Sequence, residues 1–108
     1  MDSQNVIATL SALAQETRLN IFRELVKSHA PDADQGGLAA GELASLLGVS
    51  ASSLSFHLKE MQWAQLVTSR KVGRSVIYKA NLEQMQWLVE YLLEDCCGGA
   101  CGVTANFG

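Results

Sequence analysis

Long apolar runs are missing from this chain of 108 residues. No segment approaches the roughly 20 consecutive apolar residues that a helix needs to cross a bilayer. Residues 1–5 also lack the basic segment that opens a secretory signal. We therefore expect a cytoplasmic protein that has no membrane partner.

Charged residues are also few. They make up 18% of the chain against 48% hydrophobic residues, and the formal net charge is −3. This composition is typical of a single folded domain rather than of a disordered chain. So little charge also favours burial of apolar surface against a second copy, which predicts a homodimer.

Cysteine is absent from residues 1–95, and the three that the chain has are Cys96, Cys97 and Cys101. Thiols in the cytoplasm stay reduced, so an odd number of clustered cysteines favours metal binding or reactivity over structural disulfides. We expect residues 1–95 to form one folded domain and residues 96–108 to form a flexible tail that senses metal.

Hydrophobic periodicity predicts the order helix, helix, helix, helix, strand, strand, helix. In the second helix, Leu19, Phe22 and Val26 make the cleanest apolar stripe, and in the fourth Leu54, Leu58 and Met61 should face the core. Gly48 is expected to end the third helix and Ser50 to cap the fourth. The predicted helices cover residues 3–14, 17–28, 42–47, 51–64 and 82–95, and the predicted strands cover 66–71 and 76–80.

Two short helices joined at residues 48–50 and followed by a hairpin predict a winged helix-turn-helix, a fold that is mainly α with one β-hairpin. The helix over 51–64 would enter the major groove of DNA, and the hairpin would lie along the backbone. Residues 59–79 hold five of the eight basic residues against one acid, a net +4 that suits a polyanion. The predicted DNA-binding residues are Ser52, Ser53, Ser55, Phe56, His57, Lys59, Arg70, Lys71 and Arg74.

Some of these residues have a second interpretation. His57 lies beside the core-facing stripe, where a histidine is more often a hydrogen-bonded packing residue than a ligand. Phe56, on the predicted outer face, could contact a thymine methyl group or pack against the hairpin. Trp63 and Trp87 fit core or dimer contacts better than stacking platforms.

Three sulfurs joined by glycines can converge on one ion. Structural zinc normally takes four ligands, and Asp95 could complete that set. Three soft thiolates match trivalent arsenic or antimony better, because the lone pair of these ions leaves three bonding directions. A redox thiol pair stays open as an alternative. A thiol enzyme is the least favoured, because no base and no cofactor motif accompanies the cysteines.

Three blocks of the sequence resemble the ArsR/SmtB family of metal-responsive repressors: ALAQETRLNIF at 12–22, SLSFHLKEM at 53–61 and GRSVIY at 73–78. The resemblance covers residues 6–95 and implies a homodimeric winged-helix repressor that leaves its operator when metal binds. The Cys-Val-Cys site of many arsenic-responsive members is absent before the recognition helix. The histidine-rich site of zinc-sensing members is absent from residues 82–94. The sequence instead resembles the branch with a Cys-Cys pair after the last helix and one further cysteine.

The resulting hypothesis is a repressor with As(III), or Sb(III), as inducer and with no organic cofactor. The first and last helices would pack across a two-fold axis, so that two recognition helices read an inverted repeat in double-stranded operator DNA. Metalloid binding would shift the last helix and release the DNA, and a redox-sensing or zinc-sensing repressor is the alternative. The predicted interface residues are Val6, Leu10, Leu82, Met85, Val89 and Leu92.

Overall fold

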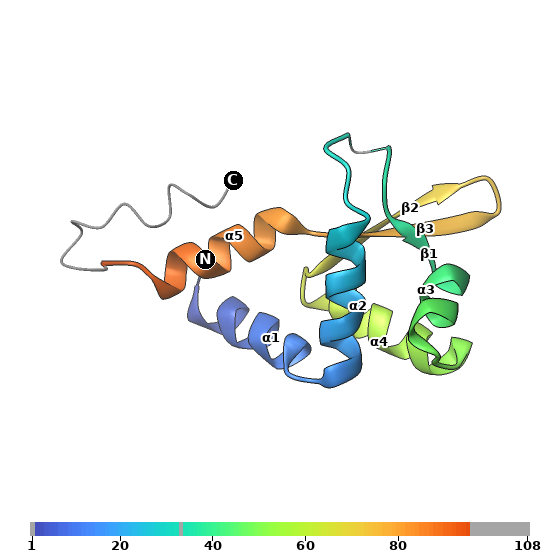
Figure 1. Cartoon of the computed structure of the whole chain (residues 1–108). Coiled ribbons are helices and arrows are strands. Elements are labelled where there is room, and N and C mark those ends of the chain that lie inside the picture. Colours follow the sequence, from blue (N-terminus) through green and yellow to red (C-terminus); the bar gives the residue numbers. More distant parts are fainter. Residues whose placement is uncertain (1, 33, 96–108) are drawn as a thin grey trace.

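In a computed structural model, the structure describes residues 2–32 and 34–95, which form helices and one antiparallel sheet (Figure 1). Within these residues, no helix has both the length and the apolar character needed to cross a membrane. The helices are α1 Ser3–Leu13, α2 Glu16–Lys27, α3 Ala40–Leu47, α4 Ala51–Trp63 and α5 Leu82–Leu92, and the strands are β1 Leu38–Ala39, β2 Val67–Val72 and β3 Ser75–Ala80.

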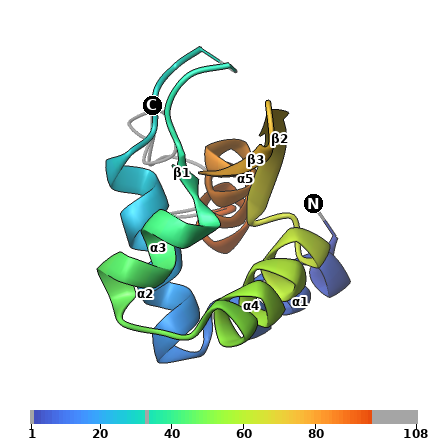
Figure 2. The same cartoon turned by 90° about the vertical axis from the view of Figure 1, so that its right-hand side faces the viewer.

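The arrangement confirms the predicted winged helix-turn-helix. Helices α2, α3 and α4 pack together, the β2–β3 hairpin projects at one end of the molecule, and α1 and α5 lie toward the other end (Figure 1). Turned by 90°, the view shows α4 lying beside α1 and α3 beside α2 (Figure 2).

The core forms around one face of α4. Leu54 and Leu58 are 1% exposed and Met61 is fully buried, which confirms the face predicted from their spacing. These side chains pack with buried residues from α1, α2, α3, β2, β3 and the connection before β2, namely Ala12, Ile21, Phe22, Leu25, Leu43, Leu66, Val67 and Ala80. Burying a Leu-sized side chain is worth roughly 1.5–3 kcal/mol, so this face fixes how α4 is rotated about its axis.

The apolar stripe predicted for α2 is partly wrong. Leu19 is 47% and Val26 41% exposed, whereas Ile21, Phe22 and Leu25 are buried. Both sets fit helical spacing, and only packing against α3 and α4 selects between them. An apolar strip of α2 therefore remains on the surface.

The turn between α3 and α4 follows its predicted chemistry. Gly48 ends α3 in the left-handed conformation, with φ +65°. Ser50 then caps α4, and its Oγ accepts a hydrogen bond from the Ser53 N–H at 3.1 Å. Both expected caps are confirmed, so the angle between the two helices follows from local sequence.

Strand β1 is an element that the sequence reading missed. Its two residues pair antiparallel with β3, Leu38 opposite Tyr78 and Ala39 opposite Ile77, and the strand order is β1-β3-β2. A strand of two residues carries no alternation that could reveal it. Gly37 directly precedes the strand, and its N–H donates to the Ser28 carbonyl at 3.0 Å. This hydrogen bond closes the base of the loop that follows α2.

Gly37 is where this packing tolerates no side chain. Its φ is +89°, and a Cβ there would lie 2.5 Å from the Tyr78 carbonyl oxygen. We expect Gly37→Ala to lower the free energy of unfolding by about 2 kcal/mol or more, because strain and overlap with backbone add. Gly41→Ala is the matched control, since a Cβ there meets nothing within 4 Å. Urea unfolding of both variants measures the difference, and equal stability would contradict the close packing of β1 on β3.

Candidate nucleic-acid interface

The exposed face of α4 is polar and small at its start. Ser52, Ser53, Ser55 and Lys59 are exposed, and Phe56 is 56% exposed among them. The Ser50 and Ser52 hydroxyls lie 3.4 Å apart. Short hydroxyl side chains let a helix approach base edges closely and can donate or accept there. The structure thus brings five of the predicted residues together on one element that nothing in the described chain covers.

His57 lies at the side of this face and is partly buried. Its Nδ1 accepts a hydrogen bond from Arg18 Nε at 3.0 Å, across 39 positions of sequence. Burial lowers the pKa of His57 below its ordinary value of 6.5, and the neighbouring Arg18 guanidinium lowers it further. The hydrogen-bonded packing role that we favoured for His57 is therefore present in the structure.

Arg18 is a residue that the sequence reading did not single out. Besides bonding His57, its guanidinium carbon lies 5.8 Å from the centroid of the Phe56 ring. The Phe56 and His57 rings meet edge to face, with centroids 5.7 Å apart. Arg18 belongs to one of the blocks quoted above, but no spacing rule relates a residue on α2 to two on α4. Only the tertiary fold shows this contact.

Two basic side chains of the hairpin are exposed to solvent, and two others lie against the rest of the protein. Lys71 and Arg74 are exposed near its turn. Arg70 instead is half-buried and donates from Nη2 to the Gly36 carbonyl at 2.9 Å. Arg70 Nε and Nη1 are buried and have no hydrogen-bond partner among the described residues. Arg70, which we had grouped with the phosphate contacts, thus lies against the loop that precedes β1.

Lys79 is held in a similar way. It is 9% exposed, and its Nζ donates to the carbonyls of Ala30 and Asp32 at 3.1 and 2.9 Å. Of the five basic residues in the stretch 59–79, Lys59, Lys71 and Arg74 are exposed, whereas Arg70 and Lys79 tie the hairpin to residues 30–36. The basic surface is therefore smaller than the sequence count indicates.

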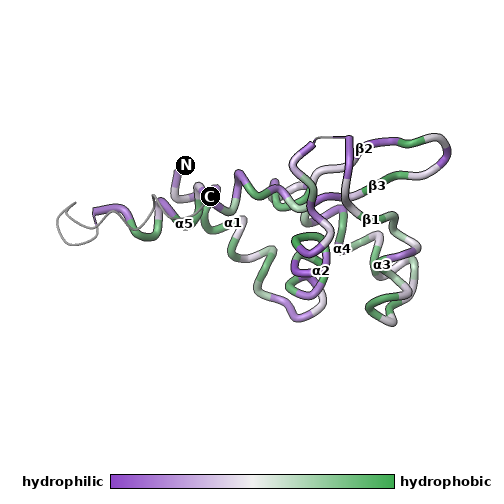
Figure 3. Tube along the Cα trace, turned by 45° about the horizontal axis from the view of Figure 1, so that its top comes forward, coloured by the Kyte–Doolittle hydropathy of each residue, from purple (hydrophilic) through white to green (hydrophobic). Residues whose placement is uncertain are grey.

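The six predicted interface residues divide by exposure. Val6 is 5% exposed and lies inside the protomer, whereas Leu10 and Leu92 are 42% and 56% exposed. The remaining three, Leu82, Met85 and Val89, are partly buried. Hydrophobic residues recur along α1 and α5 (Figure 3), and Ile7 at 64% and Trp87 at 48% exposure add apolar surface that our list lacked.

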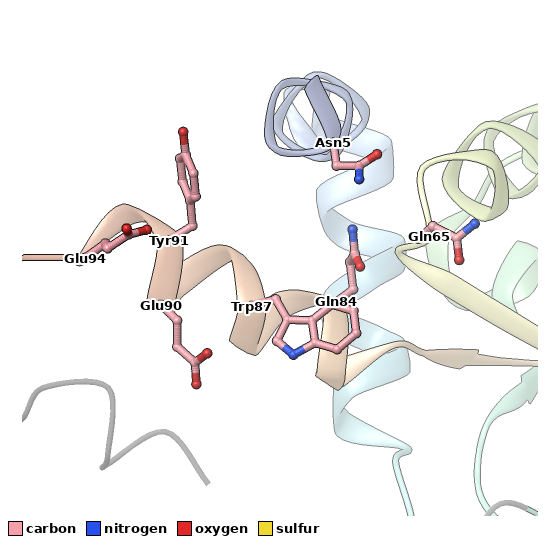
Figure 4. A pocket seen from close by; sticks show the side chains of 7 residues that line it. All are labelled: Asn5, Gln65, Gln84, Trp87, Glu90, Tyr91 and Glu94. Atoms are coloured by element: carbon pink, nitrogen blue, oxygen red, sulfur yellow. The ribbon is translucent and has the colours of Figure 1, made fainter. Parts of the chain in front are cut away.

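A groove of about 820 Å³ lies along α5 (Figure 4). It is lined by Asn5, Gln65, Gln84, Trp87, Glu90, Tyr91 and Glu94. At its inner end, Gln84 Nε2 donates to Thr9 Oγ1 at 3.1 Å, and Thr9 Oγ1 donates to the Asn5 carbonyl at 2.8 Å. The buried hydrogen bond between Gln84 and Thr9 joins α5 to α1.

The predicted thiol ligands Cys96, Cys97 and Cys101 lie outside the described residues. Within residues 2–32 and 34–95, no three His, Cys, Asp or Glu side chains gather where they could hold a metal ion. The last described residue, Asp95, follows α5 and has φ +61°. Cys96 thus follows the last residue of α5, Leu92, by four positions in the chain.

Known proteins resemble this chain in sequence and architecture. A family profile described as a helix-turn-helix domain matches residues 13–70. The transcriptional activator HlyU of Vibrio cholerae serotype O1 is 32% identical over 91 residues, which are 84% of this chain and 77% of HlyU. A structure described as reduced HlyU from Vibrio cholerae N16961 has TM-score 0.62 and 33% identity, over 88% of this chain and 92% of that chain.

Two further solved structures resemble the chain. An ArsR-like transcriptional regulator from Rhodococcus sp. RHA1 has TM-score 0.70 and 31% identity, over 82% of this chain and 76% of that chain. A protein described as a possible transcriptional regulator for arsenical resistance has TM-score 0.62 and 28% identity, over 79% of this chain and 83% of that chain.

The protonation of His57 gives a test of this geometry. Because its pKa is lowered on folding, the unfolded chain binds more protons between that lowered pKa and 6.5. The free energy of unfolding should therefore rise as pH rises through this window. As pH falls through the same window, the stability that neutral His57 contributes should be lost. An NMR titration of the imidazole should give a midpoint below 6.5. Arg18→Ala should raise that midpoint only in part, since burial is the larger cause. A midpoint at or above 6.5 in the intact protein would contradict the contact.

Proposed function

The chain belongs to the ArsR-like winged helix-turn-helix transcriptional regulators, and on that basis we propose that it is a cytoplasmic, metalloid-responsive repressor. It binds an inverted repeat in operator DNA as a homodimer. It leaves that DNA when trivalent arsenic or antimony binds Cys96, Cys97 and Cys101. The observation that carries DNA binding is the two-sided character of α4, whose apolar face is buried in the core while Ser52, Ser55 and Lys59 face solvent.

The β2–β3 hairpin, residues 67–80, is the wing of the fold, and it supplies the part of the proposed affinity that does not depend on the DNA sequence. Lys71 lies on β2 and Arg74 on the two-residue turn, where Gly73 has φ +61°. A positive φ at the first turn position is what a tight hairpin of this kind requires. Gln62 Nε2 of α4 donates to Ser69 Oγ of β2 at 2.9 Å, so the wing is joined to the recognition helix. Both elements can therefore meet one duplex as a unit.

A homodimer is supported by apolar surface on the two helices that lie away from the wing. Ile7, Leu10, Trp87 and Leu92 are each 42% or more exposed on α1 and α5. Large exposed apolar side chains on a small domain favour association with a partner. A two-fold axis at this end would present two α4 helices to successive major grooves, which explains the proposed inverted repeat.

The proposed effector follows from the donor set. Arsenous acid condenses with three thiols, forming three As–S bonds and releasing three water molecules. Thiolate sulfur is the softest ligand that this chain offers, and all three sulfurs lie within residues 96–101. The likeness to a regulator described for arsenical resistance supports the same class of inducer.

A redox-sensing repressor is the second candidate. One structure of the relative HlyU is described as reduced, and this description supports thiol oxidation as a candidate signal. In that case a disulfide between Cys101 and Cys96 or Cys97 would replace the metalloid. Oxidant in the absence of arsenite would then release DNA.

Salt dependence tests the wing. A plot of log K against log [salt] falls with a negative slope, and each phosphate contact that is lost reduces the magnitude of that slope by about 1. We expect Lys71→Ala and Arg74→Ala to do so, because both side chains are exposed on the hairpin. Arg70→Ala is the matched control on the same hairpin, and it should lower stability with little change of slope, since Arg70 bonds the Gly36 carbonyl. Fluorescence anisotropy with a duplex selected by the protein from a random pool measures the slopes. Unchanged slopes for Lys71→Ala and Arg74→Ala would remove the wing from the interface.

Thiol substitutions test the effector. Under reducing conditions, saturating arsenite should weaken binding of the same duplex by about 5- to 150-fold, the usual range of allosteric coupling. Cys96→Ala, Cys97→Ala and Cys101→Ala should each reduce this effect and leave arsenite-free binding unchanged. Asp95→Asn is the control, because three sulfurs complete the proposed donor set without it. Normal release from all three cysteine variants would contradict the metalloid site. Release by diamide but not by arsenite would favour the redox candidate.

A further inference from the structure

Arg18 joins the start of α2 to the side of the recognition helix. Its backbone N–H is capped by Gln15 Oε1 at 3.0 Å, which fixes the first turn of α2. Its side chain then reaches α4, where Nε donates to His57 Nδ1 at 3.0 Å and the guanidinium lies over the Phe56 ring. Residues that are far apart in sequence thus make one three-membered cluster.

This hydrogen bond specifies the form of the imidazole. A guanidinium has donors only and keeps its charge, so His57 Nδ1 must be the unprotonated acceptor. The single ring proton is then on Nε2. His57 can therefore offer one N–H donor at Nε2 and no acceptor, and its tautomer is set from α2 rather than from α4 itself.

The cluster lies on the side of α4 away from the wing. Gln62 lies on one flank of α4, and its side-chain amide donates a hydrogen bond to Ser69 Oγ of the hairpin. By the 100° per residue of a helix, His57 lies on the opposite flank, and the exposed Ser52, Phe56 and Lys59 lie between the two. The exposed face of α4 is thus bordered by the wing on one side and by Arg18 and His57 on the other.

Arg18 makes no ion pair in the described part of the chain, although Glu60 lines the same small pocket. Among the described residues the ion pair is Lys27 with Glu24, and no carboxylate lies within 4 Å of the Arg18 guanidinium. In the same part of the chain its hydrogen-bond acceptor is His57, through Nε. An unpaired guanidinium beside a recognition helix suits a phosphate oxygen, which accepts from a fork of N–H groups.

We propose that Arg18 is a positioning residue for operator recognition, which holds His57 as an Nε2–H donor toward the DNA while its own free N–H groups contact the backbone beside α4. This inference rests on the proposed function, and it adds a contact on the flank opposite the wing. The acceptor for His57 is a phosphate oxygen or a purine N7 at the edge of the major groove.

The experiment compares isosteres. In His57→Gln the side-chain amide places an N–H donor near the position of Nε2, whereas in His57→Asn it lies near Nδ1. Binding is measured to a duplex that the wild-type protein selects from a random pool, and to a scrambled duplex of the same composition. His57→Gln should keep most of the preference for the selected duplex. His57→Asn and Arg18→Met should each lower the preference about 5-fold or more.

A second measurement separates positioning from mere stability. A long-range ¹H–¹⁵N spectrum should show His57 protonated at Nε2 alone in the wild type and as a tautomer mixture in Arg18→Met. Arg18→Lys keeps a charged donor but lacks the fork, so it should retain general affinity and the Nε2 proton. These spectra need no DNA, and they are read even in a destabilised variant.

The outcomes are distinct. The same tautomer in wild type and Arg18→Met, or equal preference in His57→Gln and His57→Asn, overturns the positioning role while leaving the proposed repressor intact. If the wild-type protein selects no duplex at all, the proposed function fails and this inference fails with it. A loss of preference in Arg18→Met together with a mixed tautomer supports the proposal.

Discussion

The burial of one face of α4 is the constraint on which the rest of the structure depends. Leu54, Leu58 and Met61 are removed from water by α2, α3 and the start of β2, and a helix held on that side cannot rotate. Its opposite side must therefore carry Ser52, Phe56 and Lys59 into solvent. Truncating one of these core residues to alanine would cost about 2–5 kcal/mol. The same face that stabilises the domain thus aims the residues proposed to contact DNA.

Two basic side chains of the wing, Arg70 and Lys79, position it through hydrogen bonds within the protein. Arg70 and Lys79 donate to the carbonyls of Gly36, Ala30 and Asp32, so side chains of the hairpin satisfy backbone acceptors of the loop. Strand β1 closes the same unit by pairing with β3. A hydrogen bond to a charged group is worth about 1.5–3 kcal/mol, so these part-buried bonds help to hold the hairpin against the loop. The remaining exposed cations, Lys71 and Arg74, lie farther out along the hairpin.

Local sequence determines much of this fold, and long-range packing determines the remainder. The caps at Gly48 and Ser50, the buried face of α4 and the hairpin follow from residue types at short spacing, and all were predicted. The stripe on α2 was not, because Leu19 and Val26 fit the same helical period as Ile21 and Leu25, and contacts with α3 and α4 decide between them. Arg70 was placed with the DNA contacts on its charge alone. Arg18 and β1 were missed because their partners lie about 40 residues away.

Helix α5 offers a physical route from the cysteines to the recognition helix. At its start, Asn81 Nδ2 donates to the Gln65 carbonyl at 2.8 Å and the Asn81 N–H donates to the Leu66 carbonyl at 2.9 Å, where α4 ends. One turn on, Gln84 bonds Thr9 of α1. A ligand changes operator affinity only if it binds two states of the protein unequally. If metalloid binding after Asp95 tilts α5, these hydrogen bonds require α1 and the end of α4 to move with it. The distance between two α4 helices in a dimer would then change, and an inverted repeat of fixed spacing would no longer fit both.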